Sequence, residues 1–195
     1  PIPELFTKIF SEVEEIEKYQ PDIMHYPGLM KGNIRFLGEL LLGHLRYGTQ
    51  GRNNIELCHP FVRHDAIPNR NLTLAGNFNV VNVRELFDFV QVDPGQLHSE
   101  SDLAAMLEVL HHFIIREDEK NPEHLDLVTV LRESASMFDG GYHVGGLLGN
   151  GDGFVMRDPH GIRPSYYYIN DEIVVATSER PAIQTAFNVP FEEVK

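Results

Sequence analysis

The sequence has little of several features that would place it in a class at once. Its 195 residues include one cysteine, Cys58, which excludes an intramolecular disulfide framework and a cysteine-based zinc site. Lysine and arginine number 16 against 29 aspartate and glutamate residues, a formal charge of −13, and such an acidic surface disfavours nucleic acid as a partner. No apolar run approaches the ~18–20 residues that a membrane span needs. The composition therefore predicts a globular protein of the cytoplasm that binds neither nucleic acid nor membranes.

Patterns for metal and phosphate binding are also missing. His111 and His112 are adjacent and point apart on a helix, and no histidine pair stands beside a carboxylate at ligand spacing. Neither GxxxxGK[ST] nor GxGxxG occurs. Side chains of sequence neighbours such as Cys58 and His59 usually diverge, so we interpret the lone cysteine as a small buried hydrophobe rather than a nucleophile. We expect no metal and no cofactor in this domain.

The apolar periodicity predicts a mixture of helices and strands. An amphipathic helix over residues 3–20 is ended by Pro21, and the run 39–45 is apolar enough for a buried strand. We expect a loop over 53–70, further strands over 71–81, 142–148, 154–157, 166–169 and 172–176, and helices over 83–89, 101–116, 126–137 and 178–187. Because helices and strands follow no regular βαβ alternation, the pattern favours an α+β architecture.

Three polar stretches carry candidate chemistry. In GHLRYGTQG, Arg46 follows an apolar run and precedes a glycine-containing turn, where its guanidinium can bind a carboxylate by two hydrogen bonds. In GNFNVVN, Asn77 belongs to a cluster of asparagines that suggests either an ordered turn or a set of polar donors. A side-chain amide beside a free backbone N–H is what an oxyanion hole requires. Asp102 opens a predicted helix and can pair with a substrate ammonium.

Each of these stretches also has a purely structural interpretation. Arg46 can form a surface ion pair beside a turn, Asn82 can cap the helix that starts at Val83, and Asp102 can simply complement a helix dipole beside a serine cap. A fourth stretch, RDPHGIRPSYYY over residues 157–168, combines arginines, prolines and a glycine into a stiff connection between two strands.

The order of these motifs is more specific than any one of them. Six motifs in this order resemble the class II glutamine amidotransferase domain, an N-terminal-nucleophile hydrolase. They are GHLRYGTQG, HPF, GNFNVVNVREL, SD before an apolar helix, DGGYHVGGLLGNGDGFVMRDPHGIRP and VVATSERPAI. RDPHGIRP is most similar to the amidophosphoribosyltransferase branch. The resemblance covers residues 39–195, with 1–38 as a helix and loop lead-in of the same domain.

The resemblance implies a four-layer αββα sandwich that hydrolyses L-glutamine and passes ammonia to a C-terminal phosphoribosyltransferase domain, for phosphoribosylamine formation in purine biosynthesis. It implies that Arg46 binds the glutamine α-carboxylate and Asp102 the α-ammonium. Asn77 supplies the oxyanion-hole amide, and the backbone N–H of Phe78 is the second donor. The pocket beside Arg46 is shaped by Tyr47, Gly48 and Thr49. The full enzyme is expected to be a homo-oligomer, with Mg²⁺ at its phosphoribosyltransferase domain.

The sequence departs from the family pattern at two places. Phe78 stands where the family usually has glycine, and Pro1 heads a helix where the family has an N-terminal cysteine nucleophile whose α-amine is the base. We therefore expect an internal piece of a longer protein, incomplete at both ends and inactive alone. A non-catalytic regulatory or interaction domain with the same fold is the alternative, and a hydrolase that uses Cys58 is a third interpretation.

Overall fold

The computed structural model describes residues 2–26, 28–30, 38–45, 58–92 and 101–195. The chain divides into two compact units, Pro1–Leu41 and Leu42–Lys195. The first unit contains α1 (Ile2–Tyr19), which confirms the predicted amphipathic helix, followed by the short 3-10 helix η1 (Pro21–His25) with Pro21 at its start.

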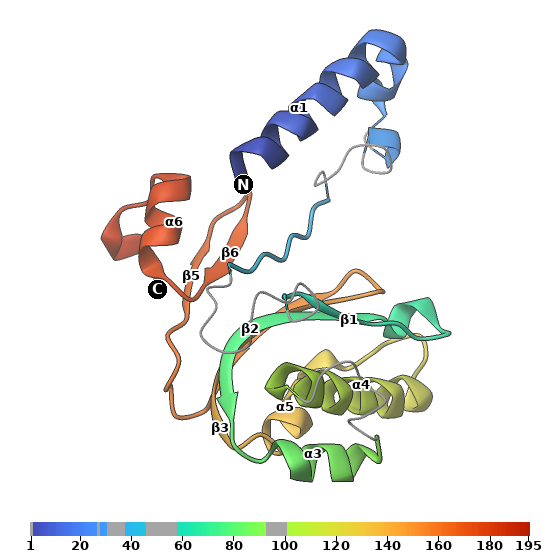
Figure 1. The fold of residues 1–195 in the computed structure, drawn as a ribbon, viewed down its shortest axis with the longest axis vertical. Coiled ribbons are helices and arrows are strands. Elements are labelled where there is room, and N and C mark those ends of the chain that lie inside the picture. The colour runs from blue at the N-terminus through green and yellow to red at the C-terminus, as the bar shows by residue number, and fades with distance from the viewer. Residues whose placement is uncertain (1, 27, 31–37, 46–57, 93–100) are drawn as a thin grey trace. The chain divides into compact units, whose positions relative to one another are not determined.

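The second unit is built on a four-stranded antiparallel sheet in the order β1-β2-β3-β4. Figure 1 shows α3, α4 and α5 on one side of this sheet. The bounds are β1 (Phe61–Arg63), β2 (Leu72–Val80), α3 (Val83–Val90), α4 (Asp102–Lys120), α5 (Leu127–Ala135), β3 (Gly140–Leu148) and β4 (Gly153–Arg157). The expected α+β architecture is confirmed at this level.

A second, two-stranded sheet follows in the chain. It pairs β5 (Tyr166–Ile169) with β6 (Val174–Thr177), and α6 (Arg180–Phe187) packs Ile183 against Tyr166, Tyr168 and Val175. The turn Asn170–Ile173 is two residues longer than predicted, because the Asn170 side chain accepts the N–H groups of Glu172 and Ile173. The chain ends with the short helix η5 (Phe191–Glu193).

The main core lies between the sheet and its helices. Even-numbered residues of β2 and β3 point into it, and α4 covers them with an apolar surface. Burying each such Leu or Met contributes roughly 1.5–3 kcal/mol. The largest fully buried members are Leu72, Leu74, Leu86, Leu103, Met106, Leu110, Ile114, Val109, Val130, Tyr142 and Val144.

The caps of the core helices follow directly from their sequences. Ser101 accepts the Ala104 N–H at 3.3 Å at the start of α4, and Asp126 accepts the Thr129 N–H at 3.0 Å at the start of α5. Each cap satisfies an N–H group that has no partner within the helix.

Two sequence predictions are wrong. Residues 38–45 form no strand, and Leu45 is 80% exposed, because an apolar run forms a strand only where a sheet edge pairs with it. Conversely, the predicted loop 53–70 contains β1, which pairs Phe61–Arg63 with Leu72–Leu74, and the short helix η3 (Pro68–Arg70).

Two ion pairs and one histidine–aspartate contact join the β1–η3 segment to α4. Arg63 Nε lies 3.0 Å from Glu108, Arg70 Nε lies 2.7 Å from Asp118, and His111 Nε2 lies 3.0 Å from Asp65. Glu108, Asp118 and His111 are all buried. Because buried charges need partners, these pairs fix the segment that leads into β2.

Candidate functional site

One edge of β2 is open beyond its short pairing with β1. The register stops at Phe61 opposite Leu74, so no strand among the described residues pairs with the stretch from Gly76 to Val80 on that side. Backbone N–H groups alternate between the two edges of an antiparallel strand. Those of Gly76, Phe78 and Val80 therefore point to this open edge.

Side chains occupy the two ends of the open edge. His59 Nδ1 accepts the Gly76 N–H at 3.5 Å, and Asp102 Oδ2 accepts the Val80 N–H at 2.8 Å. The Phe78 N–H lies between them and has no acceptor among the described residues. An isolated backbone donor between two capped neighbours is available to bind an oxygen of a ligand.

A row of aromatic rings connects the GHLRYGTQG motif to the open edge of β2. The rings of His44 and His59 lie 4.2 Å apart, and His59 stacks on Phe78 at 5.5 Å and 12°. Phe61 meets His59 edge-on at 5.6 Å. The start of GHLRYGTQG therefore lies beside Phe78. Four predicted site residues of that motif lie outside the described residues: Arg46, Tyr47, Gly48 and Thr49.

The first five residues of GNFNVVN belong to β2, which confirms the strand predicted over 71–81, so Asn77 and Asn79 lie in a strand and not in an ordered turn. Asn77 pairs with His143 and Phe78 with Tyr142, so β2 continues to Val80. Side chains alternate across a sheet, which places Phe78 on the helix-covered face, where its ring joins the core. Asn77 is exposed on the opposite face. The phenylalanine therefore finds room without displacing its own N–H from the edge.

The side chains of Asp102 and Asn82 each form hydrogen bonds to the backbone of a segment distant in sequence. Asp102 lies directly after the Ser101 cap, and its carboxylate turns to the end of β2. Its other oxygen has no donor among the described residues. Asn82 does not cap α3 with its side chain; its Nδ2 donates to Met137 O at 2.8 Å and its Oδ1 accepts the Asp139 N–H at 3.1 Å.

The Asp158–Arg163 loop is organised by one buried carboxylate. Asp158 accepts the N–H groups of Ile162 at 2.8 Å, Arg163 at 3.0 Å and Tyr142 at 3.4 Å. Burial alone raises the pKa of Asp158, but these hydrogen bonds and the Arg157 charge bring it below the usual value. The Arg157 guanidinium donates to Gly161 O and Arg163 O, so it holds the loop from the other side.

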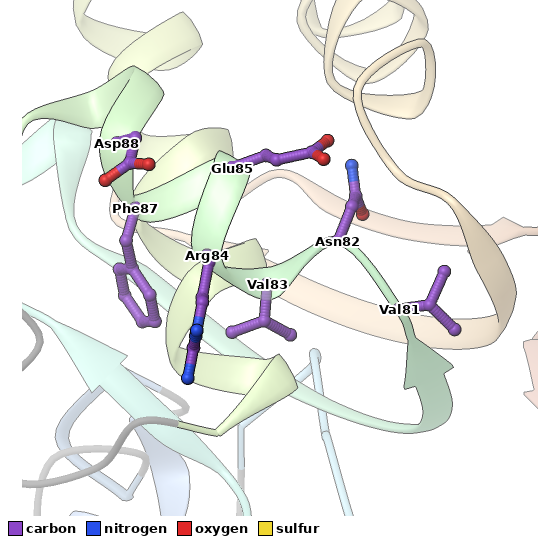
Figure 2. A pocket seen from close by; sticks show the side chains of 7 residues that line it. All are labelled: Val81, Asn82, Val83, Arg84, Glu85, Phe87 and Asp88. Carbon is purple, nitrogen blue, oxygen red and sulfur yellow. The ribbon is translucent and has the colours of Figure 1, made fainter.

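A surface hollow of about 750 Å³ lies elsewhere, at the start of α3 (Figure 2). None of its described lining residues is a predicted site residue. They are Val81, Asn82, Val83, Arg84, Glu85, Phe87 and Asp88. The hollow and the open edge of β2 are therefore different candidate sites.

The described part of the chain has neither a metal-ligand cluster nor a membrane-spanning helix. It contains no group of three or more histidine, cysteine, aspartate or glutamate side chains that could hold a metal ion. None of its helices is long and apolar enough to cross a membrane. Cys58 is exposed, which corrects the expectation of a buried hydrophobe.

Sequence reasoning missed the parts played by His59 and Gly76. The HPF motif is visible in the sequence, but nothing local shows that its histidine accepts a hydrogen bond from β2. The signal at Gly76 is steric, because a Cβ there would lie 2.4 Å from the carbonyl oxygen of His143. Glycine lets β2 and β3 approach closely beside the oxyanion-hole candidates.

Comparisons with known proteins place these motifs in a family context. No family model matches the chain. The amidophosphoribosyltransferase of Methanothermobacter thermautotrophicus is 28% identical over 153 residues, 78% of this chain and 29% of that protein. That of Pseudomonas aeruginosa is 30% identical over 132 residues, 67% of this chain and 26% of that protein. The chain thus spans less than a third of these relatives.

Solved structures give the same result. The glutamine phosphoribosylpyrophosphate amidotransferase of Bacillus subtilis, complexed with ADP and GMP, matches with a TM-score of 0.53 and 25% identity over 72% of this chain and 28% of that one. A structure described as the allosteric regulatory enzyme of purine biosynthesis matches with a TM-score of 0.56 and 26% identity over 74% of this chain and 29% of that one. The resemblance indicated by the motif order is confirmed.

Proposed function

From its relationship in sequence and fold to amidophosphoribosyltransferases, we propose that this chain is the glutamine-binding part of such an enzyme. The whole protein hydrolyses L-glutamine and uses the ammonia to form phosphoribosylamine in purine biosynthesis. Its partners are then a C-terminal phosphoribosyltransferase domain and further copies of the same protein. The finer fold proposed for the domain is the four-layer αββα sandwich.

One observation carries this proposal: three separated motifs converge on the open edge of β2. His44, at the start of the first motif, reaches Phe78 through the His59 ring, and Asp102 reaches Val80 by a hydrogen bond. About 13 Å of strand separates Gly76 from Val80, whose N–H groups are bound by His59 and Asp102. A glutamine molecule spans part of that length.

The proposed roles follow from the position of each group. Asp102 offers its unshared oxygen to the α-ammonium, and Arg46 binds the α-carboxylate. The Phe78 N–H and the Asn77 amide bind the γ-carbonyl oxygen and stabilise the negative charge that develops on it during attack. Tyr47, Gly48 and Thr49 line the pocket beside Arg46.

The proposal gives this chain substrate binding rather than nucleophilic attack. The only cysteine is Cys58, and no step is assigned to it. We therefore expect the 195-residue chain to bind glutamine and not to release ammonia from it. Ammonia release that disappears in Cys58→Ala would support the hydrolase that uses this thiol and would contradict the proposal.

Calorimetric titration with L-glutamine tests the proposal. Asp102→Asn keeps an acceptor for the Val80 N–H but removes the charge that pairs with the ammonium. A hydrogen bond to a charged group contributes about 1.5–3 kcal/mol, so we expect affinity to fall roughly 10-fold to 150-fold. Asp88→Asn, an exposed change in the hollow at α3, is the matched control and leaves affinity unchanged.

The outcomes separate the two function classes. Binding of L-glutamine, weaker binding of L-glutamate and a loss confined to Asp102→Asn support the glutaminase. No binding of glutamine to a folded chain would favour a non-catalytic regulatory or interaction domain.

A further inference from the structure

A buried histidine lies directly across the sheet from the oxyanion-hole candidate. His143 of β3 is opposite Asn77 of β2 on one side and opposite Arg157 of β4 on the other. Residues directly opposite each other share one face of the sheet, with Cβ atoms about 5 Å apart. The three side chains therefore form a polar row on the face away from the helices.

The sequence around His143 builds a slot for its ring. Gly141 and Gly145 flank it on the same face, and a Cβ on either would meet a side chain. Ile162 lies 2.7 Å from the Cβ position of Gly141, and Leu42 lies 3.0 Å from that of Gly145. The two glycines thus admit apolar side chains on both sides of the imidazole, which is 8% exposed.

The imidazole has an unused polar atom. His143 Nε2 is buried and has no hydrogen-bond partner among the described residues. Burial, and then the Arg157 charge, lower the pKa of His143, so the ring is neutral at pH 7. A buried ring nitrogen without a partner is costly, and Asn77, its exposed neighbour, has an amide that can rotate toward it.

We propose that His143 is a positioning residue for the Asn77 amide in the glutamine pocket. When glutamine binds, His143 Nε2–H donates to Asn77 Oδ1, and this bond turns Asn77 Nδ2 toward the γ-carbonyl oxygen. An asparagine can donate to an oxyanion only if its nitrogen rather than its oxygen faces that atom, so a donor to Oδ1 selects the useful orientation. This inference rests on the proposed glutamine site.

Two substitutions distinguish hydrogen bonding from packing. His143→Phe keeps a ring in the slot but removes the donor, and His143→Gln keeps an N–H donor but removes the ring. If the donor matters, calorimetry shows glutamine affinity about threefold to tenfold weaker for His143→Phe and near wild type for His143→Gln. His124→Phe, an exposed histidine between α4 and α5, is the control and binds as wild type.

Each outcome decides the proposal. Equal glutamine affinity for all variants overturns the role of His143 but leaves the glutamine site standing. The same conclusion follows if His143→Gln loses glutamine affinity while His143→Phe retains it. Failure of the unmodified chain to bind glutamine overturns the site and this inference together.

A measurement on the unmodified chain covers the case in which a variant does not fold. The ¹⁵N chemical shifts of His143 report which ring nitrogen carries the proton. We expect the Nε2–H tautomer in the glutamine complex, with a changed Nε2 shift relative to the free chain. The Nδ1–H tautomer in that complex would overturn the proposal.

Discussion

Removing the Asp158 carboxylate should destabilise the second unit by about 2–3 kcal/mol. Asp158 is 3% exposed and accepts three backbone N–H groups. The Tyr142 N–H stays buried in Asp158→Ala and costs about 1–3 kcal/mol without a partner, and the Arg163 N–H adds about 1 kcal/mol. Ile162 is 62% exposed, so water replaces its lost bond. Relief of the buried charge offsets part of the total.

Urea unfolding at pH 7 measures this change, and thermal unfolding should show a midpoint lower by about 4–12 °C. Asp171→Asn, an exposed carboxylate in the β5–β6 turn, is the control and should change stability by less than ~0.5 kcal/mol. Because its pKa is lowered by folding, Asp158 stabilises the protein above pH 3.8 and loses this contribution as pH falls through its folded pKa. An Asp158→Ala midpoint equal to wild type would refute the reasoning.

Three other changes test the packing of the same unit. Burial lowers the pKa values of His111 and His143, so below pH ~6.5 the unfolded chain binds more protons than the folded chain. The free energy of unfolding should therefore decrease as the pH is lowered in that range, by at most about 2.7 kcal/mol per pH unit for the two histidines. Urea midpoints that stay constant between pH 7.5 and 5.5 would contradict this. Gly149→Ala should cost at least ~1–3 kcal/mol, since its Cβ would meet the carbonyl oxygen of Pro68, and an unchanged melting temperature would contradict it. Tyr142→Phe removes a buried hydroxyl that has no hydrogen-bond partner among the described residues, so it should raise the free energy of unfolding by up to about 1–3 kcal/mol. A lower urea midpoint for this variant would contradict the prediction, because it would show that the hydroxyl forms a hydrogen bond.

The elements predicted well from the sequence are those with local signals. The apolar spacing of α4 and the serine before it specify a capped helix, and the structure forms both. The prediction of a strand over 39–45 is wrong, because an apolar run does not by itself provide a neighbouring strand with which to form backbone hydrogen bonds. The three residues of β1 were missed because their pairing with Leu72–Leu74 is not visible in a stretch without period.

The same limit applies to the candidate site. Asn77, Phe78 and Asp102 were named by motif order, and the structure brings Phe78 and Asp102 to one strand edge. The direction of the Phe78 N–H depends on the register with β3, and the Asp102 bond to Val80 spans 22 residues. Neither follows from local propensity.

The most direct test of the central claim follows the backbone amide of Phe78 during titration with L-glutamine. If the open edge of β2 is the glutamine site, the Phe78 ¹H signal moves downfield on binding, more than those of Asn77 and Asn79, whose N–H groups point into the sheet. An unchanged Phe78 signal, with shifts confined to Glu85 and its neighbours at the α3 hollow, would contradict the claim.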